Sequence, residues 1–297
     1  MKSLLAKTVV LIAKLCMKMP VSPFGSVLGK MYYRFMRSEH IIVREKVEGI
    51  TFELDLREAI DNAMFFMGSR EPETSRALKL LCKNGDVVID IGANIGSHTL
   101  PIASFVGEEG RVYAFEPVPW AMNKMKRNIE LNSFGNIVPE SIGLSDVNED
   151  VEMKFRASFK IGSKSGVGKE GEIDDSWWRE CEHVKVRMET LDHYVASHKL
   201  DRIDLIKLDV DGFEGKVIRG ALESLKRFSP ILIMEVAPAW TEMRGDNIKD
   251  ILYEIELLGY KFYHEIDFKE INNLTELIDA LPPGGGFNIL ASLKKII

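Results

Sequence analysis

The stretch Asp86-Val-Val-Ile-Asp90-Ile-Gly92-Ala93-Asn94-Ile-Gly96-Ser97-His98-Thr99 decides how the rest of the chain can fold. Its apolar run, residues 87–91, is too short for a helix and rich in β-branched residues, which predicts a buried strand. Gly92 and Gly96 allow a sharp turn and let a ligand approach the backbone closely. Ser97 and Thr99 can satisfy free N–H groups at the start of a following helix. Strand, turn and helix together predict a nucleotide-type cleft at the carboxyl end of a parallel sheet.

The charge at this turn limits which class of nucleotide ligand could bind there. A dinucleotide site uses G-x-G-x-x-G and places a negative pyrophosphate on the helix N-terminus. Here Asn94 stands where the second glycine would be, and Asp90 comes just before the turn. A fixed carboxylate at that place would repel a diphosphate. It would suit a ligand with a positive amino or sulfonium group and no phosphate, which describes S-adenosylmethionine.

A second carboxylate, Glu116, ends the strand expected over residues 111–116, twenty-four residues beyond Gly92. This is the place for an acid that accepts hydrogen bonds from a ribose diol. Either Asp90 or Glu116 alone could simply cap a strand end, but their order and spacing together favour a ligand. Asp146 would lie at the base edge of an adenosine cleft, where it is a candidate partner of the adenine amino group, although a turn residue fits equally well. The predicted cofactor-binding residues are Asp90, Gly92, Ala93, Asn94, Gly96, Ser97, Glu116, Pro117, Ser145 and Asp146.

Composition limits the class of protein. The chain has 297 residues, of which 45% are hydrophobic, so it can bury one large core with a small appendage. A net charge of −6 argues against nucleic acid as the main partner. Its cysteines are few and far apart without a C-x-x-C pair, which fits a reducing, cytoplasmic location and offers no zinc or disulfide framework.

The first 37 residues differ in charge from the rest of the chain. They hold seven basic residues and no acid, so the remainder has 32 basic against 45 acidic residues, or −13. Residues 1–19 predict an amphipathic helix with lysines on one face. We expect this helix to dock on its own domain or on a second subunit. The alternative is an interfacial helix that holds the protein peripherally on the inner face of an anionic membrane.

The pattern predicts three regions: a basic arm over residues 1–40, a β-hairpin and entry segment over 41–75, and a cofactor domain over 76–297. Residues 156–183 form a long irregular insertion without the pattern of a strand or a helix, and we interpret them as a lid on the acceptor side. A surface excursion whose tryptophans pack on the domain is the alternative. Further expected elements are helices over 71–81, 121–131, 191–195, 216–225 and 248–258, and strands over 137–144, 184–188, 231–235, 260–266 and 287–293.

With these elements placed, the sequence resembles the FkbM-type methyltransferases, a class I S-adenosylmethionine-dependent family. The resemblance extends from about Gly68 to the end and leaves the basic arm outside. One departure is visible, because the family typically has Asp-Val-Glu-Gly where this chain has Asp209-Val-Asp211-Gly212, which keeps the charge and shortens its reach. The stretches that carry the resemblance are residues 85–96, Phe115-Glu-Pro117, Leu144-Ser-Asp146 and Ile206-Lys-Leu-Asp-Val-Asp-Gly-Phe-Glu214.

The resemblance implies an α/β, Rossmann-like class I methyltransferase fold. Its sheet would be seven-stranded and mostly parallel, with the last strand antiparallel and helices on both faces. The implied reaction is O-methylation of a hydroxyl on a small molecule or a sugar or glycan, with S-adenosylmethionine as the cofactor. The basic arm adds a lipid-linked acceptor to these classes. The sequence carries no signal for the oligomeric state.

Methyl transfer to an alcohol needs alignment and a base that takes the proton. We predict Asp209 as the base or as the group that orients the acceptor, with Lys207 and Glu235 supporting it. Lys207 can instead serve only as the partner of a carboxylate, and Glu214 can equally stabilise its helix N-terminus or touch substrate. The candidates at neighbouring strand ends or beside the cofactor turn are Asp209, Asp211, Glu235 and His98.

Three alternatives remain open at this point. The acids Asp209, Asp211 and Glu235 could hold a hard cation such as Mg²⁺, but three acids without a known geometry do not define a site, so no metal ligand is predicted. An NAD-dependent oxidoreductase on a Rossmann-like fold is disfavoured by Asn94 and Asp90. A non-catalytic, membrane-associated protein that retains a cofactor fold is disfavoured by the intact motifs, although the basic arm keeps it open.

Overall fold

The computed structural model describes residues 41–155 and 182–296. Within these residues the chain forms two compact units, residues 41–72 and residues 73–155 with 182–296. The predictions for the basic arm over 1–40, and for nearly all of the insertion over 156–183, lie outside the described residues.

The first unit contains the predicted hairpin, which the structure confirms. Strands β1 (Ile42–Val47) and β2 (Ile50–Asp55) pair antiparallel around Glu48 and Gly49. These two turn residues have φ values of 52° and 85°, the left-handed pair that a tight hairpin with the native twist requires. Helix α3 (Ala59–Met67) follows, which the sequence pattern did not predict, and it ends where Gly68 adopts a left-handed conformation.

The second unit is built on a seven-stranded sheet with the order β11-β12-β10-β9-β3-β4-β5. Neighbouring strands pair in parallel from β10 to β5, whereas β12 is antiparallel to both of its neighbours. This arrangement confirms the predicted class I methyltransferase fold. The strands are β3 (Val87–Ile91), β4 (Arg111–Phe115), β5 (Ile137–Glu140), β9 (Leu205–Leu208), β10 (Ile231–Val236), β11 (Lys261–His264) and β12 (Phe287–Ser292).

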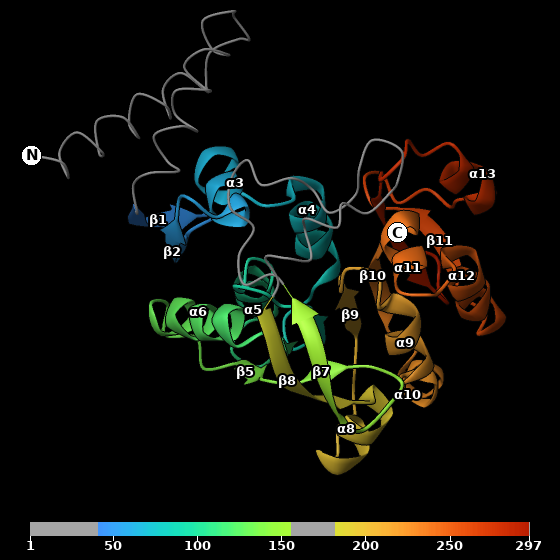
Figure 1. The fold of residues 1–297 in the computed structure, drawn as a ribbon, viewed down its shortest axis with the longest axis horizontal. Helices are drawn as coiled ribbons and strands as arrows, with labels where there is room; N and C mark the ends of the chain where they lie inside the picture. Colours follow the sequence, from blue (N-terminus) through green and yellow to red (C-terminus); the bar gives the residue numbers. More distant parts are fainter. Residues whose placement is uncertain (1–40, 156–181, 297) are drawn as a thin grey trace, which may run out of the picture. The chain divides into compact units, whose positions relative to one another are not determined.

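The strand order reverses between β3 and β9, because the chain runs outward from β3 through β4 to β5 and then returns to place β9 on the other side. Ligands of open α/β sheets bind outside the carboxyl ends of the strands at such a switch point. Helices α5 and α6 lie on one side of the strands, and α9, α10 and α12 on the other (Figure 1). The helices of this unit are α4 (Pro72–Leu81), α5 (Thr99–Val106), α6 (Pro119–Glu130), α8 (Leu191–Ser197), α9 (Glu214–Arg219), α10 (Leu222–Phe228), α11 (Pro238–Met243), α12 (Ile248–Leu257) and α13 (Leu274–Asp279).

A smaller three-stranded sheet has the order β6-β8-β7 and consists of β6 (Gly143–Leu144), β7 (Asp150–Phe155) and β8 (Glu182–Glu189). It corrects the single strand expected over 137–144, since the chain leaves the main sheet after Glu140 and pairs again with β8. Gly143 permits this crossing: a Cβ there would lie 2.6 Å from Met188 Sδ. Strand β7 was not predicted.

The helix expected over 216–225 is also wrong, because the structure has two helices, α9 and α10, separated at Gly220. A Cβ at Gly220 would lie 1.9 Å from the carbonyl oxygen of Ser145, so the backbone of a distant loop occupies the space of a side chain. Helix α11 begins at Pro238 and was not predicted, and β11 is shorter than the strand expected over 260–266.

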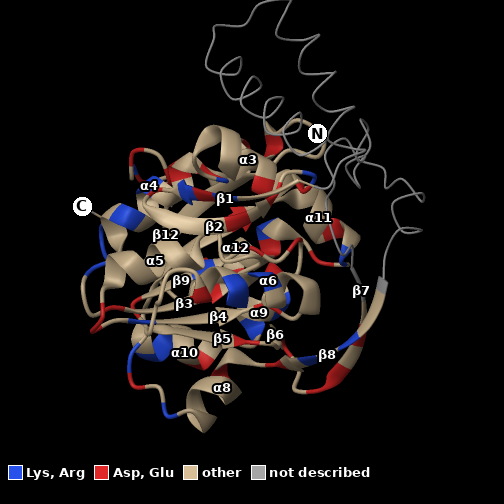
Figure 2. Ribbon diagram, turned by 90° about the vertical axis from the view of Figure 1, so that its left-hand side faces the viewer, with Lys and Arg blue, Asp and Glu red and all other residues tan. Residues whose placement is uncertain are grey.

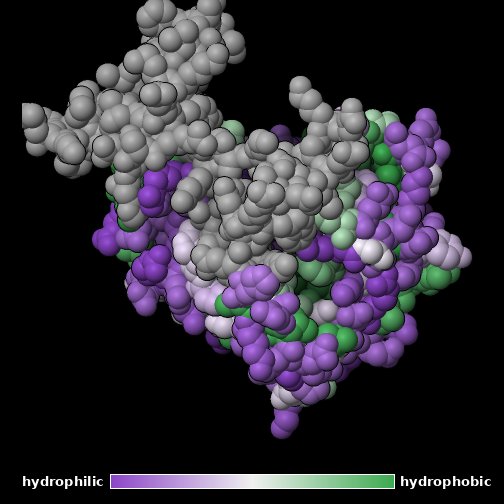
Figure 3. Space-filling model, viewed as in Figure 1, coloured by the Kyte–Doolittle hydropathy of each residue, from purple (hydrophilic) through white to green (hydrophobic). Residues whose placement is uncertain are grey.

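The surface of the described residues is mixed in charge and hydropathy. Acidic and basic residues are interspersed along the ribbon in Figure 2, and hydrophilic side chains cover most of the described surface that faces the viewer in Figure 3. Larger exposed apolar side chains include Tyr253 and Leu257 on α12, which are 59% and 68% exposed. Among the helices that the structure describes, none has both the length and the apolar character needed to cross a membrane.

Candidate functional site

The glycine turn after β3 is held by backbone contacts from two neighbouring strands. The N–H groups of Gly92 and Ala93 both donate to the carbonyl of Phe115 at the end of β4, each at 3.0 Å. Gly92 has a φ of 81°, and a Cβ on it would lie 1.9 Å from the carbonyl oxygen of Asp209. The sharp turn is therefore as predicted. The group that approaches Gly92 closely is the backbone that follows β9, so the two most informative stretches of the sequence lie in contact.

Glu116, the acid that directly follows β4, is hydrogen-bonded to this turn. Its Oε2 accepts a hydrogen bond from the N–H of Asn94 at 2.9 Å, and its Oε1 accepts from Val118 at 2.8 Å. The side chain is buried, and burial raises the pKa of its carboxyl to about 7, with the two N–H donors acting in the opposite direction. Each carboxylate oxygen keeps a second lone pair, so Glu116 can also accept hydrogen bonds from a ligand.

Asp90 lies fully buried beneath the turn. Its Oδ2 accepts a hydrogen bond of 2.6 Å from the Thr99 hydroxyl. The Thr99 hydroxyl thus donates its proton to a buried carboxylate, a contact that the sequence pattern did not predict. The spacing of nine residues between the two carries no local signal that could have shown this contact.

Two buried oxygen atoms at this turn have no hydrogen-bond partner within the described residues, Oδ1 of Asp90 and Oδ1 of Asn94. Lys207 Nζ lies 3.9 Å from the first of them. Buried polar atoms normally have a hydrogen-bond partner, so these two oxygen atoms can each accept a hydrogen bond from a ligand. The ammonium and hydroxyl groups of S-adenosylmethionine are such donors, and the residues present therefore fit this cofactor.

The predicted adenine side of the cleft lies after β6. Ser145 is buried, its N–H donates to the carbonyl of Glu189, and its hydroxyl donates to Asp146 Oδ1 at 3.1 Å. Asp146 itself is exposed. Pro117, next to Glu116, lies against β6, since a Cβ at Gly143 would be 3.4 Å from Pro117 Cβ. Gly96 is enclosed by protein, with Leu100 Cδ1 at 2.4 Å from its Cβ position, and Ser97 is buried.

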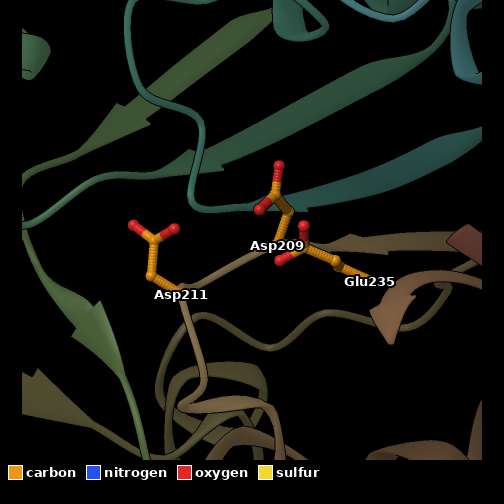
Figure 4. Close-up of side chains that lie close together, drawn as sticks. All are labelled: Asp209, Asp211 and Glu235. Carbon is orange, nitrogen blue, oxygen red and sulfur yellow. The ribbon is translucent and has the colours of Figure 1, made fainter. Parts of the chain in front are cut away.

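Asp209, Asp211 and Glu235 come together at the ends of β9 and β10, where one carboxylate oxygen of each lies within 4.8 Å of the other two. The parallel register pairs Leu208 with Met234, so the residues that follow lie side by side. Figure 4 shows the carboxylates of Asp209 and Glu235 side by side, with Asp211 on the loop that continues from Asp209. Asp211 has a φ of 50°, so a turn, and not the expected extended strand end, brings it there. Hydroxyl groups or a hard cation would both find oxygen partners in this cluster.

Lys207 lies between this carboxylate cluster and the glycine turn after β3. It pairs with Asp90 in the register of β9 and β3, and its side chain is buried. Its Nζ donates to Asp209 Oδ2 at 3.1 Å and lies 3.9 Å from Asp90 Oδ1. The ammonium group of Lys207 thus lies between Asp90, beneath the glycine turn, and Asp209, the acid predicted on the acceptor side.

His98 does not join the carboxylate cluster, which within the described residues contains Asp209, Asp211 and Glu235. It is buried at the first turn of α5, where its carbonyl accepts from Ile102. Glu214, for which the sequence left two roles open, is buried beneath the loop that carries Asp209 and Asp211.

Comparisons with known proteins identify the family of this chain. A model of the methyltransferase FkbM domain matches residues 90–262, more than half of the chain. Hexuronic acid methyltransferase AglP of Haloferax volcanii is 24% identical over 163 residues, which cover 55% of this chain and 61% of that protein. The chain therefore spans less than two thirds of the length of this relative.

Two further proteins are similar to this chain. The 2-O-methyltransferase NoeI of Sinorhizobium fredii is 27% identical over 180 residues, covering 55% of this chain and 70% of that protein. The structure of methyltransferase FkbM from Methylobacillus flagellatus has a TM-score of 0.43 at 15% identity and covers 79% of this chain and 52% of that chain.

Proposed function

Because this chain belongs to the FkbM methyltransferase family, we propose that it transfers a methyl group from S-adenosylmethionine to a hydroxyl group of a small-molecule, sugar or glycan, or lipid-linked acceptor. The observation that carries the proposal is the contact between Gly92 and Asp209, which sets the cofactor turn directly against the carboxylate cluster. The name of one relative, a 2-O-methyltransferase, supports a hydroxyl as the acceptor group.

On the cofactor side, the buried acceptors would hold the donors of S-adenosylmethionine. Asp90 Oδ1 and Asn94 Oδ1 would accept from its ammonium group, and Glu116 would accept from its ribose hydroxyls. Pro117 and the Ser145-Asp146 pair would line the adenine side. When bound, the cofactor supplies a methyl group on a positively charged sulfur atom, which an oxygen nucleophile can displace in line.

On the acceptor side, Asp209 would take the proton of the attacking hydroxyl or orient it. Glu235 and Asp211 lie within 4.8 Å and would accept hydrogen bonds from the same or a neighbouring hydroxyl group. Lys207 fixes the direction of the Asp209 carboxylate through its hydrogen bond of 3.1 Å. Holding the two reactants in line supplies much of the catalysis, because methyl transfer needs no covalent intermediate.

The test is transfer of labelled methyl from S-adenosylmethionine to fractions of a hydroxylated metabolite and glycan extract. We expect one fraction to acquire base-stable label, and Asp209→Asn to lower the rate by about 100-fold or more, as loss of a general base does. Asp267→Asn is the matched control, because Asp267 is an exposed acid whose partner is Lys269. Equal rates for wild type and Asp209→Asn would remove Asp209 from the reaction.

Titration with S-adenosylhomocysteine, read together with this transfer experiment, separates the remaining alternative. A protein that binds S-adenosylhomocysteine but labels none of the fractions would be a binding module with a retained cofactor fold. The nicotinamide alternative is set aside by membership of the methyltransferase family.

A further inference from the structure

Glu214 lies at the first position of α9, directly after the loop that carries Asp209 and Asp211. Its side chain is 2% exposed. Its Oε1 accepts hydrogen bonds from two backbone N–H groups of that loop, Val210 at 3.1 Å and Gly212 at 3.4 Å. A single carboxylate oxygen is thus bonded to the residues on both sides of Asp211.

The loop around this carboxylate has a conformation that few sequences adopt unaided. Asp211 and Gly212 are left-handed in succession, with φ values of 50° and 93°. A positive φ is uncommon for a non-glycine residue, although aspartate tolerates it better than most, and two residues with a positive φ in succession turn the chain sharply. The loop also lies close against α11, because a Cβ at Gly212 would lie 2.3 Å from the carbonyl oxygen of Trp240.

We infer that Glu214 is a positioning residue, whose carboxylate holds the loop so that Asp209 and Asp211 face the acceptor together. The inference rests on the proposed function for the identity of what these two acids face. It assigns Glu214 no contact with substrate. The role follows from its two hydrogen bonds to the loop and from its burial beneath it.

Ionisation of Glu214 sets the strength of this contact. Burial raises the pKa of its carboxyl to about 7, the negative charge of Asp209 adds to the rise, and the N–H donors of the loop oppose it. Charged groups packed nearby are Asp246, against Gly215, and Arg244, over the ring of Phe213. Hydrogen bonds to an ionised acceptor are about twice as strong as neutral ones. The loop should therefore be held more firmly above about pH 7 than below it.

The test is amide hydrogen exchange of the full chain, read at Val210 and Gly212 and corrected for the intrinsic effect of pH. Glu214→Leu removes both acceptor atoms at similar volume, whereas Glu214→Gln keeps an acceptor oxygen and removes the charge. Glu223→Gln is the control, since Glu223 on α10 is an exposed acid paired with Lys226. If the Leu variant does not fold, the Gln variant still tests the role of the charge.

In the wild type we expect protection of both amides to increase between about pH 6 and about pH 8. Glu214→Gln should abolish that increase, Glu214→Leu should speed both exchanges by about tenfold or more, and Glu223→Gln should change neither. Transfer of labelled methyl to the extract, measured at saturating S-adenosylmethionine, should decline less below about pH 7 in Glu214→Gln than in the wild type, an effect that a merely structural role would not produce. Unchanged protection and an unchanged pH profile in Glu214→Gln would overturn the inference.

The failure of this inference can be told apart from the failure of the proposed function. Wild-type protein that binds no S-adenosylhomocysteine contradicts the proposed function, whatever the exchange data show. Binding of S-adenosylhomocysteine with unaltered loop protection in both Glu214 variants contradicts only the role of Glu214.

Discussion

The backbone N–H of Asn94 donates a hydrogen bond of 2.9 Å to the carboxylate of Glu116, which joins the glycine turn after β3 to the end of β4. The bond fixes the orientation of a residue with a left-handed φ of 51°. It also places the acid predicted for the ribose hydroxyls directly beside the turn predicted for the methionine end of the cofactor.

The first prediction concerns pH. The pKa of Glu116 rises from an ordinary 4.5 to about 7 in the folded protein, so the folded state holds a proton between these values that the unfolded state has lost. This group therefore contributes most stability below its unfolded pKa, and the contribution is lost as the pH rises through about 7. Affinity for S-adenosylhomocysteine should change in the opposite direction, because ribose hydroxyls bind the ionised carboxylate.

Calorimetric titration with S-adenosylhomocysteine and thermal unfolding, each measured between about pH 4.5 and about pH 7, check the predicted directions of the affinity and of the stability. Glu116→Gln should reduce the pH dependence of each. An affinity that is independent of pH in the wild type would mean that Glu116 does not contact the ligand.

The second prediction concerns Gly92. Gly92→Ala should destabilise the protein and abolish binding of S-adenosylhomocysteine, because the new Cβ would meet the Asp209 carbonyl oxygen at 1.9 Å. Gly85→Ala is a matched control, since Gly85 has nearly the same φ of 84° but no atom within 4 Å of the Cβ position. We expect a loss of about 1–3 kcal/mol of unfolding free energy from the backbone in both variants, with a further loss at Gly92 only. Equal urea midpoints for the two would argue against the contact.

The sequence predicts some parts of the fold and of the candidate site and misses others, as particular residues show. The turn after β3, Glu116 and the acids at the carboxyl ends of β9 and β10 were predictable because each lies where a short apolar strand ends, and parallel strands bring their carboxyl ends to one edge. The division of residues 214–228 into α9 and α10 was not, because it depends on the Ser145 carbonyl, which approaches Gly220 from a distant loop. The bond from Thr99 to Asp90 likewise joins groups whose spacing of nine residues has no periodic signature. The two bonds to Glu214 depend on the left-handed turn at Asp211, where the sequence pattern predicted an extended strand end.

The third prediction tests the buried pair of Asp90 and Lys207, whose charged atoms are 3.9 Å apart. Lys207→Met should lower the unfolding free energy by about 3–5 kcal/mol, since it leaves buried carboxylates without their cation. The double variant Asp90→Asn with Lys207→Met should recover part of that loss. A double-mutant cycle by urea unfolding measures the coupling, and additive effects would show that the two charges do not interact.

The fourth prediction uses two buried tyrosines. The Tyr260 hydroxyl has no hydrogen-bond partner in the part of the chain that the structure describes, whereas the Tyr194 hydroxyl donates to Glu140 at 2.8 Å. Tyr260→Phe should leave stability unchanged or raise it by about 1 kcal/mol, and Tyr194→Phe should lower it by about 1–3 kcal/mol. Thermal unfolding of both variants checks the contrast, and a clear loss of stability in Tyr260→Phe would reveal a partner for that hydroxyl.

The most direct test of the central claim is isothermal titration of the full chain with S-adenosylhomocysteine, repeated on Asp90→Asn and Glu116→Gln. The account predicts micromolar binding by the wild type and a loss of at least about tenfold in affinity in each variant, since each loses a charged hydrogen-bond acceptor. Glu223→Gln, an exposed acid paired with Lys226, should bind as the wild type does. Absence of binding by the wild type, or equal affinity in all four proteins, would contradict the cofactor site described here.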